Sequence, residues 1–265
     1  MRATDQPIAP WQRWQLVATI VGIGGALLLV LAGTVLALIG RSTPPDQTMP
    51  APAATGAVAA DTRDRIAAQP MASLAPDAAR STAPSAELAQ SIDVPVATID
   101  GPAGVHTGFP HTPEGAVGQL AAIEVRVIEA MSIPVAHEVH QAWAMPGGVN
   151  AAQWELTTSV QAFLSASGQE GNAKDETTMV AAVPAAAQVK GTDGPDWVLA
   201  CVLLDVRASI VADARIGWGH CERMVWTSDR WLIGPGLPPA TAPSTWPGSQ
   251  AAIDAGWLRW QETQR

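Results

Sequence analysis

The longest uncharged stretch of the chain lies between Arg13 and Arg41, and it restricts the possible folds more than any other feature of the sequence. Within it, residues 16–39 are apolar or small apart from two threonines. A helix of this length rises roughly 36 Å, which is enough to cross the hydrocarbon core of a bilayer. The sequence therefore predicts a transmembrane anchor over residues 14–40.

The residues around this run predict how it sits in a membrane. Trp11 and Trp14 lie at its start, where indole rings favour the membrane interface. A cleaved signal peptide is the alternative, but its apolar region is typically about 7–15 residues long, and this one is longer. Arg2 and Arg13 place the tail, residues 1–13, in the cytoplasm. We therefore expect a single-pass protein of the cell membrane whose C-terminal domain lies outside.

The composition changes after the apolar run. Residues 41–104 are rich in Pro and Ala, and they contain no aromatic residue and no cysteine. Such a segment buries too little apolar surface to offset the entropy that ordering costs. We therefore expect residues 41–104 to form a disordered linker that holds the following domain away from the membrane.

A globular domain is predicted over residues 105–265, and its first helix has a clear start signal. Thr112 is a suitable N-cap residue, Pro113 suits the first helical position, and Glu114 complements the positive end of the helix dipole. Apolar residues then recur at helical spacing, and two further stripes of this period follow before Gly168.

In the second half of the domain the period of the pattern changes from helical to strand-like. Residues 197–207 form a long apolar run typical of a buried strand, and apolar and polar residues alternate over 216–226. Short strands are expected around Pro184 and at 231–233, and Ser249 can cap a short C-terminal helix. Helices followed by an antiparallel meander predict an α+β fold, with helices packed on one face of the sheet.

The two cysteines lie in consecutive predicted strands. If these strands form a hairpin that turns around Val211, Cys201 and Cys221 are directly opposite each other. Directly opposite residues lie within reach of a disulfide, and an oxidising compartment would favour the bond. Two buried free thiols are the alternative. We expect the disulfide.

Candidate pocket residues lie along one predicted strand. Trp218, His220 and Glu222 are two residues apart, so their side chains share one face of the sheet. His220 and Glu222 could act there as acid and base. A buried histidine that only pairs with a neighbouring carboxylate is the alternative, and it is the more common arrangement.

Other signatures of chemistry are absent from the sequence. His137 and His140 are three residues apart, whereas helical zinc sites space their histidines by four, and no third ligand is evident. No Gly-x-Ser-x-Gly elbow and no phosphate-binding loop occurs. We therefore predict no catalytic residue, no metal, no cofactor and no enzyme activity. The net charge of −9 also disfavours direct binding to nucleic acid.

Two segments carry a resemblance to a known family: Gly-Phe-Pro-His-Thr-Pro-Glu-Gly-Ala-Val at 108–117 and Val-Trp-Thr-Ser-Asp-Arg-Trp-Leu at 225–232. With the anchor and linker, they make the chain similar to actinobacterial membrane-anchored conjugation proteins that carry a nuclear-transport-factor-2-like domain, as in type IV secretion scaffolds. The resemblance covers roughly residues 105–260. It implies a cone-like domain of helices on a curved antiparallel sheet that acts through protein contacts.

These features together predict a non-enzymatic, membrane-anchored scaffold or adaptor of an envelope-spanning conjugation or secretion system. Its expected partners are the lipid bilayer, other membrane proteins and a second copy of the chain, because Ala18, Gly22 and Ala26 repeat every four residues along the anchor. An extracytoplasmic ligand-binding or catalytic domain that uses His220 and Glu222 is the alternative. A stationary protein of the cell envelope is a second alternative.

Overall fold

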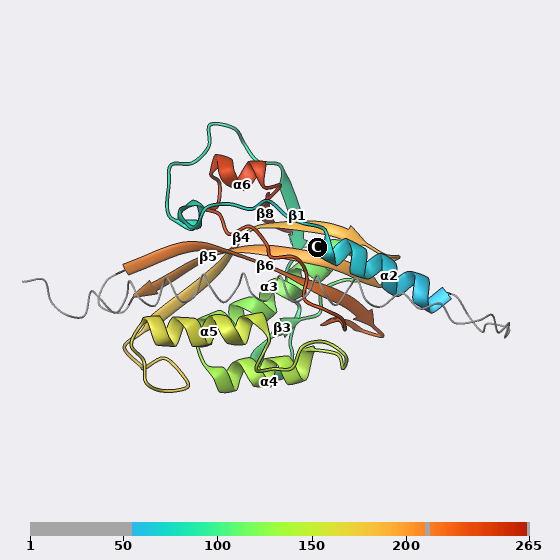
Figure 1. The fold of residues 1–265 in the computed structure, drawn as a ribbon, viewed down its shortest axis with the longest axis horizontal. Helices are drawn as coiled ribbons and strands as arrows, with labels where there is room; N and C mark the ends of the chain where they lie inside the picture. The colour runs from blue at the N-terminus through green and yellow to red at the C-terminus, as the bar shows by residue number, and fades with distance from the viewer. Residues whose placement is uncertain (1–54, 210–212, 264–265) are drawn as a thin grey trace, which may run out of the picture. The chain divides into compact units, whose positions relative to one another are not determined.

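A six-stranded sheet runs through the residues that the computed structural model describes, 55–209 and 213–263 (Figure 1). Its strands follow the order β1-β8-β4-β5-β6-β7. Neighbouring strands are antiparallel except β1 and β8, which are parallel. The strands are β1 (Ser91–Pro95), β4 (Met179–Thr192), β5 (Trp197–Ser209), β6 (Asp213–Thr227), β7 (Arg230–Ile233) and β8 (Leu258–Thr263).

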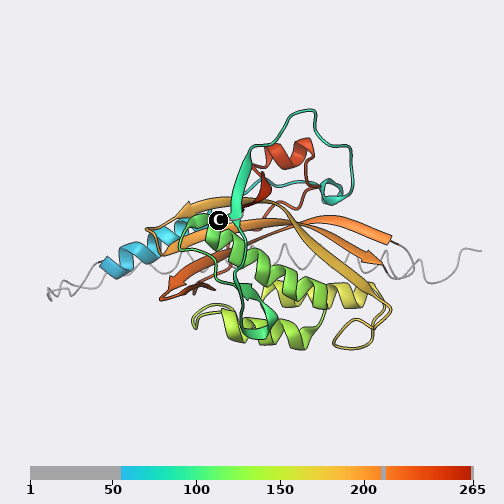
Figure 2. The ribbon, with the colours of Figure 1, turned by 180° about the vertical axis from the view of Figure 1, so that it is seen from behind.

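Three helices pack on one face of this sheet, as Figures 1 and 2 show from opposite sides. They are α3 (Pro113–Ala130), α4 (Ile133–Trp143) and α5 (Glu155–Ala166). The apolar stripe of α3 supplies Leu120, Ile123 and Val127, which are fully buried against the even-numbered residues of β5, such as Val202 and Leu204. The domain is therefore α+β, with helices on a curved, mostly antiparallel sheet.

Helices α3 and α6 begin at the caps that the sequence predicts. The Thr112 hydroxyl accepts a hydrogen bond from the Gly115 amide, Pro113 is the first helical residue, and Glu114 lies in the first turn of α3. Ser132 caps α4 in the same way. The last predicted cap, Ser249, starts α6 (Gln250–Asp254). These caps satisfy amide groups that have no partner inside the helix.

The second face of the sheet is also covered. Here α2 (Thr55–Ala68), α6 and the chain between 237 and 249 lie over the odd-numbered residues of β5. Trp197 and Leu199 pack with Ala67, and Leu203 belongs to a cluster with Trp257. As a result, β5 is buried on both faces over its first ten residues.

Residues 55–104 correct the prediction of a disordered linker over residues 41–104, whereas residues 41–54 lie outside the described residues. From Thr55 on, that segment contains α2, a 3₁₀ helix (η1, Pro76–Ala79), β1, and a small hairpin of β2 (Ile99–Asp100) and β3 (His106–Thr107) joined by η2 (Pro102–Gly104). Ala67 and Val94 are fully buried. The segment orders because it packs on surfaces formed by distant residues, which its own composition does not reveal.

The prediction of a transmembrane helix is also corrected. Across residues 55–209 and 213–263, no helix combines the length and apolar character that crossing a bilayer requires. The longest of these helices, α3, carries charged residues and packs on the sheet. The expected single-pass location, which depends on that helix, is corrected with it. The residues behind that prediction, 1–13 with Trp11 and 14–40 with Trp14, lie outside the described residues.

Three smaller differences concern element boundaries. The last helical stripe before Gly168 forms α5, which begins at Glu155, and Asn150 and Gln153 before it form a turn of their own. Pro184 lies inside one long strand, β4, at a bulge where the register with β5 shifts. After α6 the chain continues as β8, a strand that local periodicity does not indicate.

Candidate functional site

A cavity of about 220 Å³ lies beside the free edge of β6, next to the start of α5. β7 pairs with β6 only at Met224–Thr227, and in the described part of the chain no other strand pairs with this edge of β6, apart from an isolated bridge of Arg80 to Ile216. The loop between α4 and α5 and the chain at 234–239 line the cavity opposite the strand. The titratable residues in its wall are His140, Glu155, His220, Glu222 and Arg223.

A buried histidine–carboxyl pair lies behind this wall. His220 Nδ1 is 2.9 Å from Glu124 Oε1, and both side chains are almost completely buried. Burial lowers the pKa of His220 to about 3. Burial, together with the nearby carboxyls of Glu222 and Glu155, raises the pKa of Glu124 well above its usual range. Burial therefore favours the neutral form of both groups.

With both groups neutral, the hydrogen bond runs from Glu124 to His220. A protonated Glu124 donates to Nδ1 of His220, so the imidazole proton is on Nε2, which faces the cavity residues. Glu124 Oε2 has no hydrogen-bond partner among the described residues. A neutral carboxyl oxygen without a partner costs less than a buried carboxylate oxygen, which agrees with a protonated Glu124.

Glu222 connects the buried pair to the cavity. Its Oε1 accepts a hydrogen bond of 2.8 Å from the indole of Trp154 and lies 3.5 Å from His220 Nε2. Burial raises the pKa of Glu222 to about 7, and the hydrogen bond from Trp154 opposes this rise. Glu222 therefore exchanges a proton near neutral pH, in contact with the cavity.

Glu155, the first residue of α5, provides a second carboxyl at the cavity rim. Its Oε2 is 3.8 Å from His220 Nε2, and its side chain is 45% exposed. Burial raises the pKa of Glu155, although less of it is buried than of Glu222. One imidazole edge thus faces two carboxyls, one inside the cavity and one at its opening.

The predicted pocket residues line two different hollows. His220 and Glu222 line the cavity as a pair, whereas Trp218 stacks on His220 with a centroid distance of 5.2 Å. Trp218 itself lines a different, mainly apolar hollow between α5 and the β5–β6 pair. The alternation of β6 puts all three side chains on the helix face of the sheet, as the sequence predicts.

The histidines of α4 do not form a metal site. In the described part of the chain, no group of three or more His, Cys, Asp and Glu could hold a metal ion. His140 lines the cavity, with its Nε2 3.0 Å from the Val149 carbonyl oxygen and its ring edge-on to Trp154. Burial lowers the pKa of His140, an effect that the bond to Val149 opposes.

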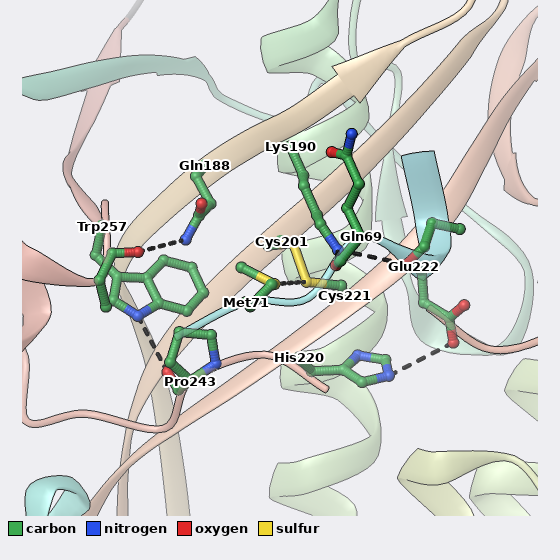
Figure 3. Close-up of a disulfide and its surroundings, with 12 residues drawn as sticks. Gln69, Met71, Gln188, Lys190, Cys201, His220, Cys221, Glu222, Pro243 and Trp257 are labelled. Carbon is green, nitrogen blue, oxygen red and sulfur yellow. Dashed lines mark hydrogen bonds and ion pairs between the residues drawn. A yellow bond between two sulfur atoms is a disulfide. The ribbon is translucent and has the colours of Figure 1, made fainter. Parts of the chain in front are cut away.

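Cys201 and Cys221 form a disulfide in the register expected from a hairpin around Val211. The bond lies on the second face of the sheet, where Met71 Sδ is 3.6 Å from Cys221 Sγ. Figure 3 shows Met71 beside the disulfide and the contact between His220 and Glu222 on the same strand. The disulfide therefore joins the two strands directly behind the cavity wall.

Sequence reasoning missed three members of the site. Glu124 lies within the apolar stripe of α3, beside Ile123, and a carboxyl on a buried helix arc is a signal that it has a partner. Glu155 follows the buried Trp154 at the start of α5, and nothing local indicates its position near His220. Trp154 is a buried core residue, and its indole N–H also donates to Glu222.

No protein-family model, no curated protein and no solved structure matches the chain. The resemblance to conjugation proteins with a nuclear-transport-factor-2-like domain therefore stays a prediction.

Proposed function

We propose that the domain binds a small polar molecule in the cavity beside β6 and that Glu222 transfers a proton to or from it. The observation that carries this proposal is the position of the Glu222 carboxyl. It lies in the cavity wall, accepts a bond from Trp154 and approaches His220 within 3.5 Å. A carboxyl in this position can act as a general acid or base on a molecule that enters the cavity.

The surrounding groups support this role in two ways. A pKa of about 7 means that Glu222 is present in both protonation states at neutral pH, which is favourable for acid–base chemistry. His220 and Glu124 supply an oriented imidazole N–H that stabilises the ionised form of Glu222 once its proton has left. Trp154 does the same from another side.

The scaffold function predicted from the sequence has less support. It rested on an anchored domain without a constellation of titratable groups, and the anchor is not supported. Glu124, His220 and Glu222 form such a constellation beside a cavity. The acid–base pocket is therefore the better supported function.

A screen of small polar molecules by ligand-observed NMR tests this proposal. The variant Gly148→Leu should block the cavity, because Gly148 lies at its rim and has space for a side chain. Gly171→Leu is the matched control, since Gly171 lies in an exposed loop away from the cavity lining. We expect molecules that bind the wild type and the Gly171→Leu variant but not the Gly148→Leu variant.

The pH dependence of that binding tests the role of Glu222. Affinity in the wild type should change between pH 6 and 8, and the change should be absent from Glu222→Gln, which keeps an acceptor for Trp154. A screen without cavity-specific binders, or binding whose pH dependence survives in Glu222→Gln, would exclude the proposal.

A further inference from the structure

The free edge of β6 exposes the backbone of one residue to the cavity. Strand β6 pairs with β5 from Asp213 to Val225, but β7 covers its other edge only from Met224 on. Between Gly217 and Arg223, every second residue of β6 therefore directs its N–H and C=O away from β5. These outward groups need partners from elsewhere.

The disulfide identifies which residues point outward. In antiparallel pairs, residues that do not share hydrogen bonds lie closer together than residues that do, at roughly 4.5 Å against 5.5 Å. The Cα atoms of Cys201 and Cys221 are 4.0 Å apart, so this pair shares no hydrogen bonds. The N–H and C=O of Cys221 therefore point away from β5, towards the free edge.

The two neighbours with the same orientation have partners. The Gly219 amide donates to Ser244 Oγ at 3.1 Å, and the Arg223 carbonyl accepts from the Gly234 amide at 2.6 Å. Cys221 lies between them, and its outward N–H and C=O have no partner within the described part of the chain. Cys221 also lines the cavity, opposite residues 234–239.

We propose that the cavity binds one aminoacyl residue of an extended peptide, which pairs with Cys221 as a strand residue would. The peptide carbonyl accepts a hydrogen bond from the Cys221 N–H, and the N–H of the same residue donates to the Cys221 C=O. This inference rests on the proposed function, because it names the class of ligand for the same cavity. It places the peptide residue beside Glu222, the next residue of β6.

The neighbouring contacts limit the length of this pairing. Ser244 occupies the edge at Gly219, and Gly234 occupies it at Arg223. The free edge therefore accommodates one pair of hydrogen bonds and not a longer added strand. The ligand is thus a short peptide or a chain end, and its recognition depends on a single residue with both an amide N–H and a carbonyl.

The test uses N-acetyl-alanine methylamide and its lactate analogue, in which an ester oxygen replaces the alanine N–H. Both are titrated into the ¹⁵N-labelled chain and followed by the amide resonance of Cys221. We expect the alanine compound to shift this resonance downfield and to bind about tenfold more tightly than the lactate compound, since one hydrogen bond is lost. Binding should be lost in Gly148→Leu and retained in Gly171→Leu.

Equal affinity of the two compounds, or an unchanged Cys221 resonance while either compound binds, would overturn the peptide inference. So would the absence of any binding by the alanine compound. These results differ from a failure of the proposed function. If other polar molecules still bind in the cavity with the pH dependence set by Glu222, the acid–base pocket stands and only the ligand class is wrong.

Discussion

At the residue scale, burial determines which side chains of the site carry a charge. Burial favours the neutral forms of Glu124 and His220, since desolvation of an isolated ion costs far more than a hydrogen bond returns. Glu222 lies closer to the cavity and has a pKa of about 7. It is therefore the member of this group whose charge changes near neutral pH.

The raised pKa of Glu222 predicts a pH-dependent contribution to stability. Its pKa is 4.5 in an ordinary setting and about 7 in the folded protein, so between these values the folded state binds more protons than the unfolded state. Relative to Glu222→Gln, the wild type should lose roughly 3 kcal/mol of unfolding free energy as the pH rises from 4.5 to 7. Urea unfolding of both proteins across this range measures the difference.

The comparison with Glu222→Gln isolates this residue from His220, whose lowered pKa acts in the opposite direction over part of the same range. Glu138→Gln, on the exposed side of α4, is the control for the change in net charge. A stability difference between wild type and Glu222→Gln that stays constant from pH 4.5 to 7 would contradict the burial of an ionisable Glu222.

At the element scale, the sequence predicts those features that depend on neighbours in the chain. Thr112 and Ser249 mark helix starts, and the alternation over 216–226 places His220 and Glu222 on one face. The β1–β8 pairing and the packing of α2 are not predictable in this way, because each depends on residues more than a hundred positions away. Glu124, the partner of His220, lies 96 positions away in the sequence and is not predictable from local pattern either.

The disulfide between β5 and β6 should stabilise this hairpin. The disulfide closes a loop with a sequence separation of 20, which corresponds to a stabilisation of about 3 kcal/mol in the chain-entropy model. The double variant Cys201→Ala, Cys221→Ala should lose at least this much unfolding free energy. Reductant should shift the urea midpoint of the wild type and leave that of the double variant unchanged. A wild-type midpoint insensitive to complete reduction would contradict a stabilising bond.

At the scale of the whole molecule, the sheet depends on both ends of the described chain. β1 and β8 pair with each other in parallel, and β8 pairs with β4 at Ala186 and Ala187. On the second face, α2 and the C-terminal segment cover the odd-numbered residues of β5 together. The functional domain therefore extends well before the boundary at residue 105 that composition suggested.

Two shortened chains test this extent. A chain of residues 53–265 contains every described element, whereas a chain of residues 105–265 lacks α2 and β1 and exposes side chains such as Trp197 and Leu199. Each large apolar side chain contributes roughly 1.5–3 kcal/mol when buried, and a domain of this kind has a total stability of about 5–15 kcal/mol.

We expect the longer chain to unfold cooperatively in urea. The shorter chain should lack a cooperative transition and bind the dye ANS, because apolar surface is left uncovered. Cooperative unfolding of the shorter chain at the same urea midpoint would mean that residues 55–104 contribute nothing to the stability of the fold. It would contradict the packing of α2 on the second face of the sheet.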